Sequence, residues 1–512
     1  MKIIIWLAAV FLIATPIAML AGRGDLATLF FVLLIICILI PIRRRYGLKQ
    51  ARRRKYGKLH GSAKFADSDD IDYYQYGSDE WSKTLALGWM PKKNWVNKTD
   101  PRYRVSKKHV LTLAPTGSGK GVGCVIPTLL EYQGNIVCLD IKGENWAVTH
   151  AWREKTGHYV VKLDPFNVCG GGTDGVDVIS WLRSYPDDAI SDALLIADSF
   201  VVSDGGGKSD HWDESAKALL QGLLVYASEA DLSLSDVRDI VCKSGDAFIG
   251  ALKPMLRSPS DVVRRCAESY SEREPKEVSG ILSTAIRHTA FLDERKISKV
   301  LNDKDGFSIG NLRWSDADIY LIIPPERVGI YGRYIRLILT LCLTAISRIK
   351  SQKQVLFLLD EVCQLGRLEP LETAISLTRG YEAFLWLIVQ DLSQLRGTYR
   401  DKWGTFFSNS VSQFFGTADY NTAQYLSDSL GNKTEFYTSH GTGGIGTDKE
   451  SDSESETIIK RELMTAGEIM AMAGTEALIF CAGKPPAKVR KLNYLTDHTY
   501  KGAAAENPMH QK

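Results

Sequence analysis

A glycine-rich segment between an apolar run and a helical pattern constrains this 512-residue chain more than any other feature. The segment reads Ala-Pro-Thr-Gly-Ser-Gly-Lys-Gly and covers residues 114–121. A bound phosphate needs backbone N–H groups that converge from a tight turn, a helix N-terminus behind them, and one cation. Gly117 and Gly119 permit the turn, and Lys120 supplies the cation. The segment therefore predicts a phosphate-binding loop between a strand and a helix.

The match to the pattern G-x-x-x-x-G-K-[ST] is incomplete at both ends. Ala114 replaces the first glycine, and Gly121 replaces the hydroxyl residue that normally holds Mg²⁺. This puts metal coordination in doubt, but not phosphate binding. A glycine-rich turn that merely precedes a helix is the alternative. The residues predicted to surround the phosphates are Pro115, Thr116, Gly117, Ser118, Gly119, Lys120 and Gly121.

Short apolar runs alternate with helical patterns from His109 onwards. Strand, helix, strand, helix and strand are predicted in turn from HVLTLA, VGCVIPTLLEY, NIVCLDIKGE, WAVTHAWREKTG and YVVKLDPF. This order predicts an α/β fold with a parallel sheet and helices on both of its faces. Apolar positions recur at helical spacing over residues 176–305, which predicts an inserted all-α domain. We therefore expect one nucleotide-binding domain built from residues 59–175 and 306–512.

The run VLFLLDE, residues 355–361, predicts a buried strand that carries two acids to the carboxyl edge of the sheet. Asp360 is placed there to hold Mg²⁺, directly or through water. Glu361 is placed to orient and deprotonate an attacking water. An apolar strand that ends in Asp-Glu is common by itself, so the functional interpretation depends on the phosphate loop upstream.

Two further polar residues lie near predicted strands. AFLWLIVQ, residues 383–390, predicts the strand beside the acidic one and ends in Gln390, which would sense the γ-phosphate or simply be exposed beyond the strand. Arg379 precedes Gly380 at a predicted helix C-terminus. It would cap helix carbonyls there or act as an arginine finger on the γ-phosphate of a neighbouring subunit.

Asp140 and Lys142 end the strand that follows the phosphate loop, again at the predicted ligand edge. They form a plain turn, or their side chains support the nucleotide or couple its state to a moving domain. With the phosphate loop and the acidic strand, these residues predict ATP and Mg²⁺ as the cofactors.

Two uncharged apolar runs, residues 3–21 and 26–42, precede the α/β pattern. Each has about the ~17–25 residues that a helix needs to cross a membrane. A cleavable signal peptide is the alternative for the first run. The second run continues into a basic segment that the positive-inside rule keeps in the cytoplasm. Residues 1–58 therefore predict a helical hairpin that spans the inner membrane. Both ends of the hairpin and the ATPase would lie in the cytoplasm, and the basic segment would contact the lipid headgroups.

The positive charge of the chain comes from that one segment. The chain has 63 basic and 60 acidic residues, and nine of the basic ones lie within residues 43–58, which contain no acid. The rest is slightly acidic, so the net charge gives no evidence for a broad nucleic-acid-binding surface. The nine cysteines are dispersed without metal-ligand spacing and predict reduced core residues.

Two local patterns lie near the C-terminal end. Residues 439–456 are rich in glycine, serine and acids, which predicts a mobile surface loop. Thr465 and Glu468 have the spacing of a capping box, which predicts the start of a helix.

The chain resembles the TraG-type coupling proteins of type IV secretion and conjugation. The motifs that carry the resemblance are APTGSGKGVGCVIPTLL, LDIKGEN, HWDESAKALL, LLDEVCQLGRLEPLE, TRGYEAFLWLIVQDLSQL and SNSVSQFFGTADYNTA. It extends from about residue 60 to residue 464, and the GKG form of the phosphate loop is similar to one branch of the family. The paired membrane runs agree with it.

The resemblance implies a RecA-like motor of the FtsK/HerA type with an all-helical insertion, forming a homo-hexamer at the inner membrane. Its partners would be a relaxase or relaxosome with single-stranded DNA, or effector proteins, together with inner-membrane components of the secretion system. Family roles fall on Lys120 for phosphate, Asp360 and Glu361 for metal and water, Arg379 as the inter-subunit arginine and Gln390 as the sensor.

Two other functions are open from the sequence. One is a chromosome-segregation DNA translocase, which the short chain after the last core strand disfavours. The other is a nucleotide-gated receptor that docks cargo without translocating it. The sequence does not distinguish DNA from protein cargo, and it does not identify residues that line a pore.

Overall fold

The computed structural model describes residues 49–72, 74–91, 102–202, 209–443 and 451–508, and a few isolated positions before residue 49. Contacts divide the chain into two compact units. The smaller unit comprises residues 1–64 and 423–469, and the larger unit comprises residues 65–422 and 470–512. The predicted membrane runs, apart from isolated positions in the second, lie outside the described residues, so the hairpin stays a prediction.

The larger unit is built on one eleven-stranded sheet. Its strand order is β2-β1-β13-β12-β9-β3-β8-β7-β4-β6-β5. Neighbours from β9 to β5 pair in parallel, whereas β12, β13, β1 and β2 are antiparallel to their neighbours. The strands are β1 Leu85–Trp89, β2 Arg102–Val105, β3 His109–Leu113, β4 Asn135–Asp140, β5 Tyr159–Leu163, β6 Ala317–Ile322, β7 Val355–Leu359, β8 Ala383–Val389, β9 Ser410–Phe414, β12 Glu476–Phe480 and β13 Ala487–Arg490.

β7 and β8 are apolar along their whole length because both faces of the sheet are covered there. All residues of β7 and β8 are buried, and so are those of β4 and β6. The mixed α/β fold with a parallel sheet that the alternating pattern predicted is confirmed, and β7 lies beside β8 as expected. The residues that follow β7 and β8 therefore lie side by side at the carboxyl edge of the sheet.

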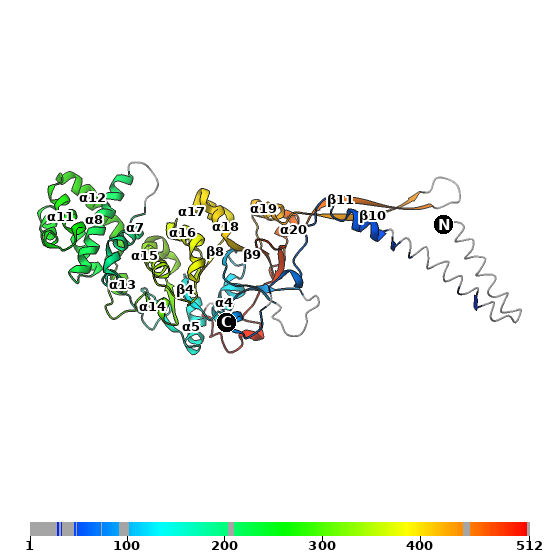
Figure 1. Ribbon diagram of the computed structural model, residues 1–512, viewed down its shortest axis with the longest axis horizontal. Coiled ribbons are helices and arrows are strands. Elements are labelled where there is room, and N and C mark those ends of the chain that lie inside the picture. Colours follow the sequence, from blue (N-terminus) through cyan, green and yellow to red (C-terminus); the bar gives the residue numbers. More distant parts are fainter. Residues whose placement is uncertain are drawn as a thin grey trace. The chain divides into compact units, whose positions relative to one another are not determined.

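Helices connect the parallel strands across the faces of the sheet (Figure 1). The one between β6 and β7 is α15 Val328–Arg348. Together with the preceding turn it forms Pro325–Arg348, the one stretch of the described residues that is long and apolar enough to cross a membrane. However, 67% of its most apolar window is buried inside the protein, as in a core helix. The other connecting helices are α4 Ile126–Glu131, α5 Glu144–Lys155, α16 Glu369–Leu377, α17 Leu392–Tyr399 and α18 Trp403–Asn409.

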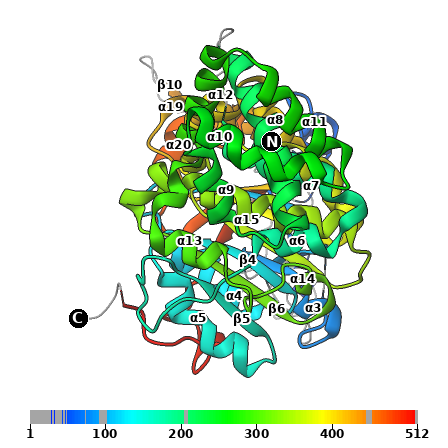
Figure 2. The same ribbon diagram turned by 90° about the vertical axis from the view of Figure 1, so that its left-hand side faces the viewer.

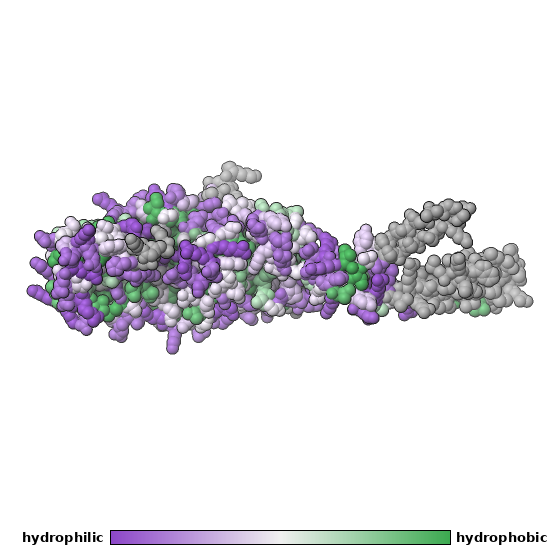
Figure 3. Space-filling view, turned by 90° about the horizontal axis from the view of Figure 1, so that it is seen from above, coloured by the Kyte–Doolittle hydropathy of each residue, from purple (hydrophilic) through white to green (hydrophobic). Residues whose placement is uncertain are grey.

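The chain between β5 and β6 is helical (Figures 1 and 2). We call this part the helical insertion. Its outer surface in the view of Figure 3 is mostly hydrophilic, with scattered apolar side chains. Its α-helices are α6 Val178–Ser184, α7 Ala189–Phe200, α8 Ser209–Glu229, α9 Leu234–Val241, α10 Gly245–Leu252, α11 Asp261–Glu272, α12 Pro275–Thr289, α13 Arg295–Leu301 and α14 Asn311–Trp314.

The smaller unit contains a hairpin of β10 Asn432–Gly443 and β11 Ser451–Glu462. The predicted mobile loop over 439–456 is therefore wrong for residues 439–443 and 451–456, which pair in register. The polar composition of these residues suggested a loop. However, the strands of an exposed ribbon are held by backbone hydrogen bonds, which do not require apolar side chains. The basic segment meets this ribbon, since Arg53 Nη2 lies 3.3 Å from Glu456 Oε1.

The capping box predicted from spacing is present before α20 Ala466–Met470. The backbone N–H of Glu468 donates to Thr465 Oγ1 at 3.2 Å, and the N–H of Thr465 donates to Glu468 Oε2 at 2.8 Å. These two bonds satisfy helix N–H groups that have no partner within the helix.

Two buried ionic clusters connect distant segments of the larger unit. Arg153 of α5 bonds Asp318 of β6 through Nε at 2.7 Å and Nη2 at 2.8 Å, and both side chains are almost fully buried. In the second cluster, Glu131 at the end of α4 accepts hydrogen bonds from Arg102, Arg104 and Tyr500. The helix that follows the phosphate loop is thereby fixed to both β2 and the C-terminal segment.

Asp318→Asn is expected to lower the free energy of unfolding by roughly 3–5 kcal/mol, because it leaves the buried guanidinium of Arg153 without a carboxylate. Burial raises the pKa of Asp318, but Arg153 and His158 outweigh it and lower the pKa overall, so the carboxylate is charged at neutral pH. Thermal melting of the full-length chain followed by circular dichroism measures the change. Asp316→Asn is the matched control, because that carboxylate pairs with Lys353 at the surface, where an ion pair contributes about 0–1 kcal/mol. Equal melting of the two variants would contradict the prediction.

Candidate functional site

The phosphate loop connects β3 to the helix that begins at Gly121. Gly117 and Gly119 adopt φ values of +76° and +80°, a backbone region that residues with a side chain rarely occupy. The N–H of Ser118 donates to the carbonyl of Pro115 at 3.1 Å, which closes the turn. No atom lies within 4 Å of a Cβ built on either glycine, so both face open space. The loop thus presents a bare backbone where a ligand can approach.

Lys120 bonds both acids that follow β7. Its Nζ lies 2.8 Å from Asp360 Oδ1 and 2.8 Å from Glu361 Oε1. Gln390, directly after β8, donates from Nε2 to Glu361 Oε2 at 3.1 Å. The structure therefore brings together four of the residues predicted from sequence, although their segments are up to 270 positions apart, from 120 to 390.

The backbone of Glu361 is unusual. Its φ of 53° and ψ of 35° lie in the left-handed region, where a residue with a Cβ is strained. Besides Lys120 and Gln390, the side chain of Gln364 donates to its carboxylate. Three donors thus hold Glu361 in this conformation, which is typical of residues at functional sites.

The electrostatics keep Lys120 and Glu361 charged. Burial lowers the pKa of Lys120, but the carboxylates of Asp360 and Glu361 outweigh it and raise that pKa overall. Burial raises the pKa of Glu361, yet its bonds to Lys120 and Gln390 lower it below the usual value. Burial raises the pKa of Asp360 despite the pull of Lys120. A charged Glu361 can accept a proton from a water, and Lys120 can bind an anion.

Asp140 ends β4, the strand next to β7, and hydrogen-bonds within its own turn. Its carboxylate accepts from the backbone N–H of Trp146 at 2.9 Å and of Lys142 at 3.4 Å. Burial raises the pKa of Asp140 to about 7, although these bonds oppose the shift. The side chain of Lys142 is exposed. These contacts suit the plain-turn interpretation, and a role toward a nucleotide stays a prediction.

Arg379 lies at the opposite edge of the sheet from Lys120. It belongs to the short 3-10 helix Thr378–Tyr381 before β8, whereas Gln390 follows that strand. Seven residues of strand at ~3.3 Å each separate the two edges by about 20 Å. Arg379 is exposed. Burial lowers the pKa of His109 to about 4, and the positive charge of Arg379 nearby adds to this shift. Arg379 therefore does not reach the Lys120 site of its own chain.

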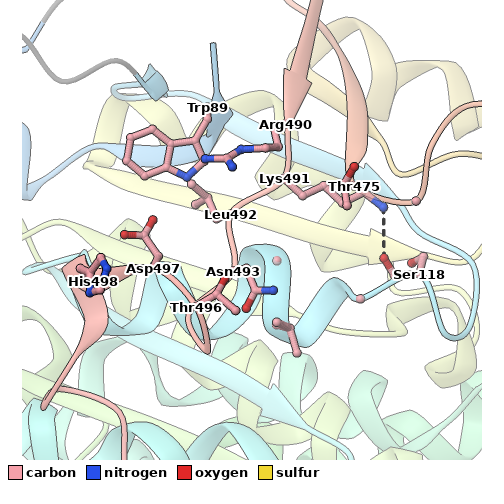
Figure 4. Close-up of a pocket in the computed structure, with 14 residues that line it drawn as sticks. Trp89, Ser118, Thr475, Arg490, Lys491, Leu492, Asn493, Thr496, Asp497 and His498 are labelled. Carbon is pink, nitrogen blue, oxygen red and sulfur yellow. Dashed lines mark hydrogen bonds between the residues drawn. The ribbon is translucent and has the colours of Figure 1, made fainter. Parts of the chain in front are cut away.

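A cavity of about 510 Å³ lies beside the phosphate loop (Figure 4). Ser118 and Gly119 form one side, and the end of β13 with the segment after it forms much of the rest. Lys491 Nζ donates to the carbonyl of Ser118 at 3.1 Å, and burial lowers the pKa of Lys491 to about 8. The ring of Trp89 and the carboxylate of Asp497 also face this space in Figure 4.

The sequence did not predict Trp89, Lys491 and Asp497 as site residues because they belong to no recognisable motif. They end or follow strands at the antiparallel end of the sheet, and only the strand order places them beside residues 118 and 119. A basic residue in the sequence KVRKLNYL gave no signal that it would be buried.

The position of the missing hydroxyl faces a carboxylate. A Cβ built on Gly121 would lie 3.7 Å from both side-chain oxygens of Glu144, the first residue of α5. Asn507 Nδ2 donates to Glu144 Oε1 at 2.7 Å. Oxygen ligands suit Mg²⁺, and the carboxylate of Glu144 lies where a hydroxyl at residue 121 would point. Among the described residues no cluster of three or more His, Cys, Asp or Glu side chains could hold a metal ion by itself.

The family model for type IV secretory system conjugative DNA transfer matches residues 69–512. The chain belongs to this family. The match covers the phosphate loop, the acidic strand and the helical insertion, so the resemblance drawn from the motifs is confirmed.

Curated relatives carry related names. The chain is 27% identical to the protein VirD4 of Rhizobium radiobacter over 87% of this chain and 65% of that protein. It is also 27% identical to a conjugal transfer protein TraG of Escherichia coli over 87% of this chain and 78% of that protein. The chain thus spans about two thirds of the VirD4 relative.

Solved structures of the plasmid coupling protein TrwB share the fold. The form in complex with ADP and Mg²⁺ superimposes with a TM-score of 0.58 at 16% sequence identity, over 84% of this chain and 96% of that one. The form in complex with a non-hydrolysable ATP analogue gives a TM-score of 0.56 at 18% identity. The likeness shows that this chain and TrwB share a fold.

Proposed function

We propose that this protein is an ATPase that couples cargo to a type IV secretion channel in conjugation. The observation that carries the proposal is the joint contact of Lys120 with Asp360 and Glu361 behind a glycine-rich loop. The nucleotides in the TrwB structures support ATP or a related nucleotide as the ligand. Family membership supports conjugative transfer as the process.

Each residue of the site has a role in hydrolysis under this proposal. The backbone N–H groups of residues 117–121 bind the phosphates, and Lys120 exchanges its carboxylate partners for phosphate oxygens. Glu361, released from Lys120, accepts a proton from the attacking water, while Gln390 orients Glu361 through their hydrogen bond. The cavity beside Ser118 accommodates the nucleoside.

Mg²⁺ would be held by Asp360, with Glu144 facing the place of the missing hydroxyl. When bound, the metal supplies charge that offsets the phosphate oxygens.

Lys120→Ala and Glu361→Gln are each expected to reduce ATP turnover at least about a hundredfold, because phosphate neutralisation and water activation are lost. Release of inorganic phosphate by the purified full-length protein is the measurement. Glu361→Gln should still bind an ATP analogue, whereas Lys120→Ala should bind it more weakly. Turnover like that of the wild type in either variant would mean that the catalytic residues lie elsewhere.

Adding single-stranded DNA to the same assay separates two functions. A DNA motor is expected to turn over ATP faster with DNA, and a receptor that only docks cargo is expected to show no change. The contact between Lys120 and Glu361, which this proposal assigns to hydrolysis, supports an enzyme that turns over ATP, and the response to DNA then separates a motor from a receptor.

Arg379 acts, in our proposal, on the nucleotide of a neighbouring copy in a homo-hexameric ring. Its place at the sheet edge about 20 Å from the phosphate loop of its own chain supports a role between subunits. An arginine supplied in this way makes hydrolysis depend on the position of the neighbour.

Mixing Arg379→Ala with Lys120→Ala is expected to restore part of the ATP turnover that each variant lacks alone. Some mixed interfaces combine an intact phosphate loop with an intact arginine, so the rate should rise above the sum of the separate rates. Steady-state turnover over a range of mixing ratios measures this. Strictly additive rates would assign Arg379 to capping the carbonyls of α16 instead.

We further propose that residues 1–42 anchor the protein in the inner membrane with the ATPase in the cytoplasm. The two uncharged runs and the basic segment after them support this topology. The cargo would be a relaxase with its single-stranded DNA, or an effector protein.

Deletion of residues 1–42 is expected to release the protein from membranes, because it removes both apolar runs and leaves the basic segment. Sedimentation of membranes from cells that express either form measures the change. The full-length protein should stay in the pellet after a high-salt wash, which removes proteins held only by charge. A deleted form that still pellets after that wash would show a further membrane contact.

A further inference from the structure

Lys491 lies directly after β13 and reaches the phosphate loop with its side chain. The residue is only 8% exposed. Its Nζ donates to the carbonyl of Ser118 at 3.1 Å (Figure 4) and to the carbonyl of Phe415 at 3.3 Å. The same nitrogen lies 4.1 Å from the centre of the Phe415 ring. The buried end of this side chain is thus bonded to main-chain oxygens, one of which belongs to the loop itself.

The surroundings of Lys491 fix where its amine lies. A Cβ built on Gly123, in the helix after the loop, would lie 3.7 Å from the Cβ of Lys491, so the two segments are closely packed. The N–H of Phe415 donates at 2.9 Å to the carbonyl of Leu113, the last residue of β3. Lys491 therefore connects Ser118 to the end of the strand that precedes the loop.

The carbonyl of Ser118 belongs to the same planar peptide unit as the N–H of Gly119. In a trans peptide these two groups point in opposite directions. Because Lys491 holds the carbonyl, the N–H of Gly119 is directed away from Lys491. That N–H is one of the backbone groups to which the proposed function assigns a phosphate.

This peptide unit can turn over unless a contact holds it. Such a turn changes the ψ of Ser118 and the φ of Gly119, and glycine accepts positive and negative φ about equally. Gly119 has a φ of +80°, and no atom lies within 4 Å of a Cβ built on it, so crowding does not hold this part of the loop in place. In the turned-over state the oxygen of Ser118 would take the place of the N–H and repel a phosphate.

We propose that Lys491 is a positioning residue that keeps the N–H of Gly119 directed toward the phosphate site. Its hydrogen bond to Ser118 selects one of the two orientations of the peptide unit before a nucleotide arrives. An ammonium suits this task, because hydrogen bonds from a charged donor are roughly twice as strong as neutral ones. The inference rests on the proposed function, since it concerns phosphate binding at the same loop.

The charge of Lys491 depends on pH within a measurable range. Burial lowers the pKa of Lys491 to about 8, because a charge is less stable away from water. Burial also raises the pKa of Cys124, the titratable group that faces Lys491 from the helix after the loop, so this thiol is neutral at pH 7. The amine is therefore charged at neutral pH and loses its proton in mildly alkaline solution.

Lys491→Met removes the donor and keeps an apolar side chain of similar length. In the full-length protein it is expected to raise the Kd for ADP with Mg²⁺ and the KM for ATP at least about tenfold, which corresponds to ~1.4 kcal/mol. The kcat should stay within about threefold of the wild-type value, because the N–H binds phosphate in the ground state and the transition state alike. Calorimetry measures the Kd, and release of inorganic phosphate measures KM and kcat. Lys488→Met is the matched control and should change neither, since Lys488 lies on the same strand and pairs with Glu476 of β12.

A purely structural role would give a different pattern. A lower melting temperature and a lower kcat with an unchanged KM would overturn the proposal, and so would wild-type values of Kd and KM in a folded Lys491→Met variant. Absence of nucleotide binding by the wild-type protein would contradict the proposed function and this inference with it. Wild-type binding that Lys491→Met retains in full would contradict the inference alone.

A second measurement does not depend on how well the variant folds. The Kd of the wild-type protein for ADP with Mg²⁺ should rise from about pH 7 to about pH 9.5, because a neutral amine is a weaker donor than an ammonium. Lys120 stays charged over this range, since its two carboxylates raise its pKa. Arg490, Asp497 and His498 also line the cavity, and a flat series for Lys491→Met would show that none of them causes the change. A wild-type Kd that does not respond to pH overturns the proposal.

Discussion

The ion pairs of Lys120 with Asp360 and Glu361 depend on one geometric constraint. Parallel strands that lie side by side end at the same edge of a sheet, so residues far apart in sequence meet there. In this protein β3, β8 and β7 are neighbours, and they deliver a lysine, a glutamine and two acids to a single point. The helices, the insertion and the antiparallel strands are arranged around that edge without interrupting it.

The sequence predicts those residues of this site that belong to a recognisable local pattern. Asp360 and Gln390 end long apolar runs, and Lys120 belongs to a glycine pattern, so local sequence places all three. Lys491 and Glu144 have no such signal. They approach the phosphate loop only because β13 and α5 return to it in three dimensions. Spacing along the chain cannot supply that information.

The incorrect prediction has a different cause. Residues 439–456 have the composition of a loop, and their composition gives no sign that the two halves pair with each other. A two-stranded ribbon depends on register between its strands, whereas a buried strand depends on an apolar run. The membrane hairpin, in contrast, is a hypothesis from apolar length alone, and its two runs lie almost entirely outside the described residues.

The left-handed backbone of Glu361 has a consequence for how the site responds to a ligand. That conformation costs roughly 1–2 kcal/mol for a residue with a Cβ, and hydrogen bonds from Lys120, Gln390 and Gln364 oppose the cost. A ligand that takes Lys120 away removes one of these restraints while the strain remains. The turn from Glu361 to Gly366 then becomes the part of the sheet edge most able to relax. Under the proposed function, a phosphate that takes Lys120 would leave Gln390 and Gln364 as the two side-chain restraints on this strained residue, so any change of shape on nucleotide binding is expected to begin at this turn.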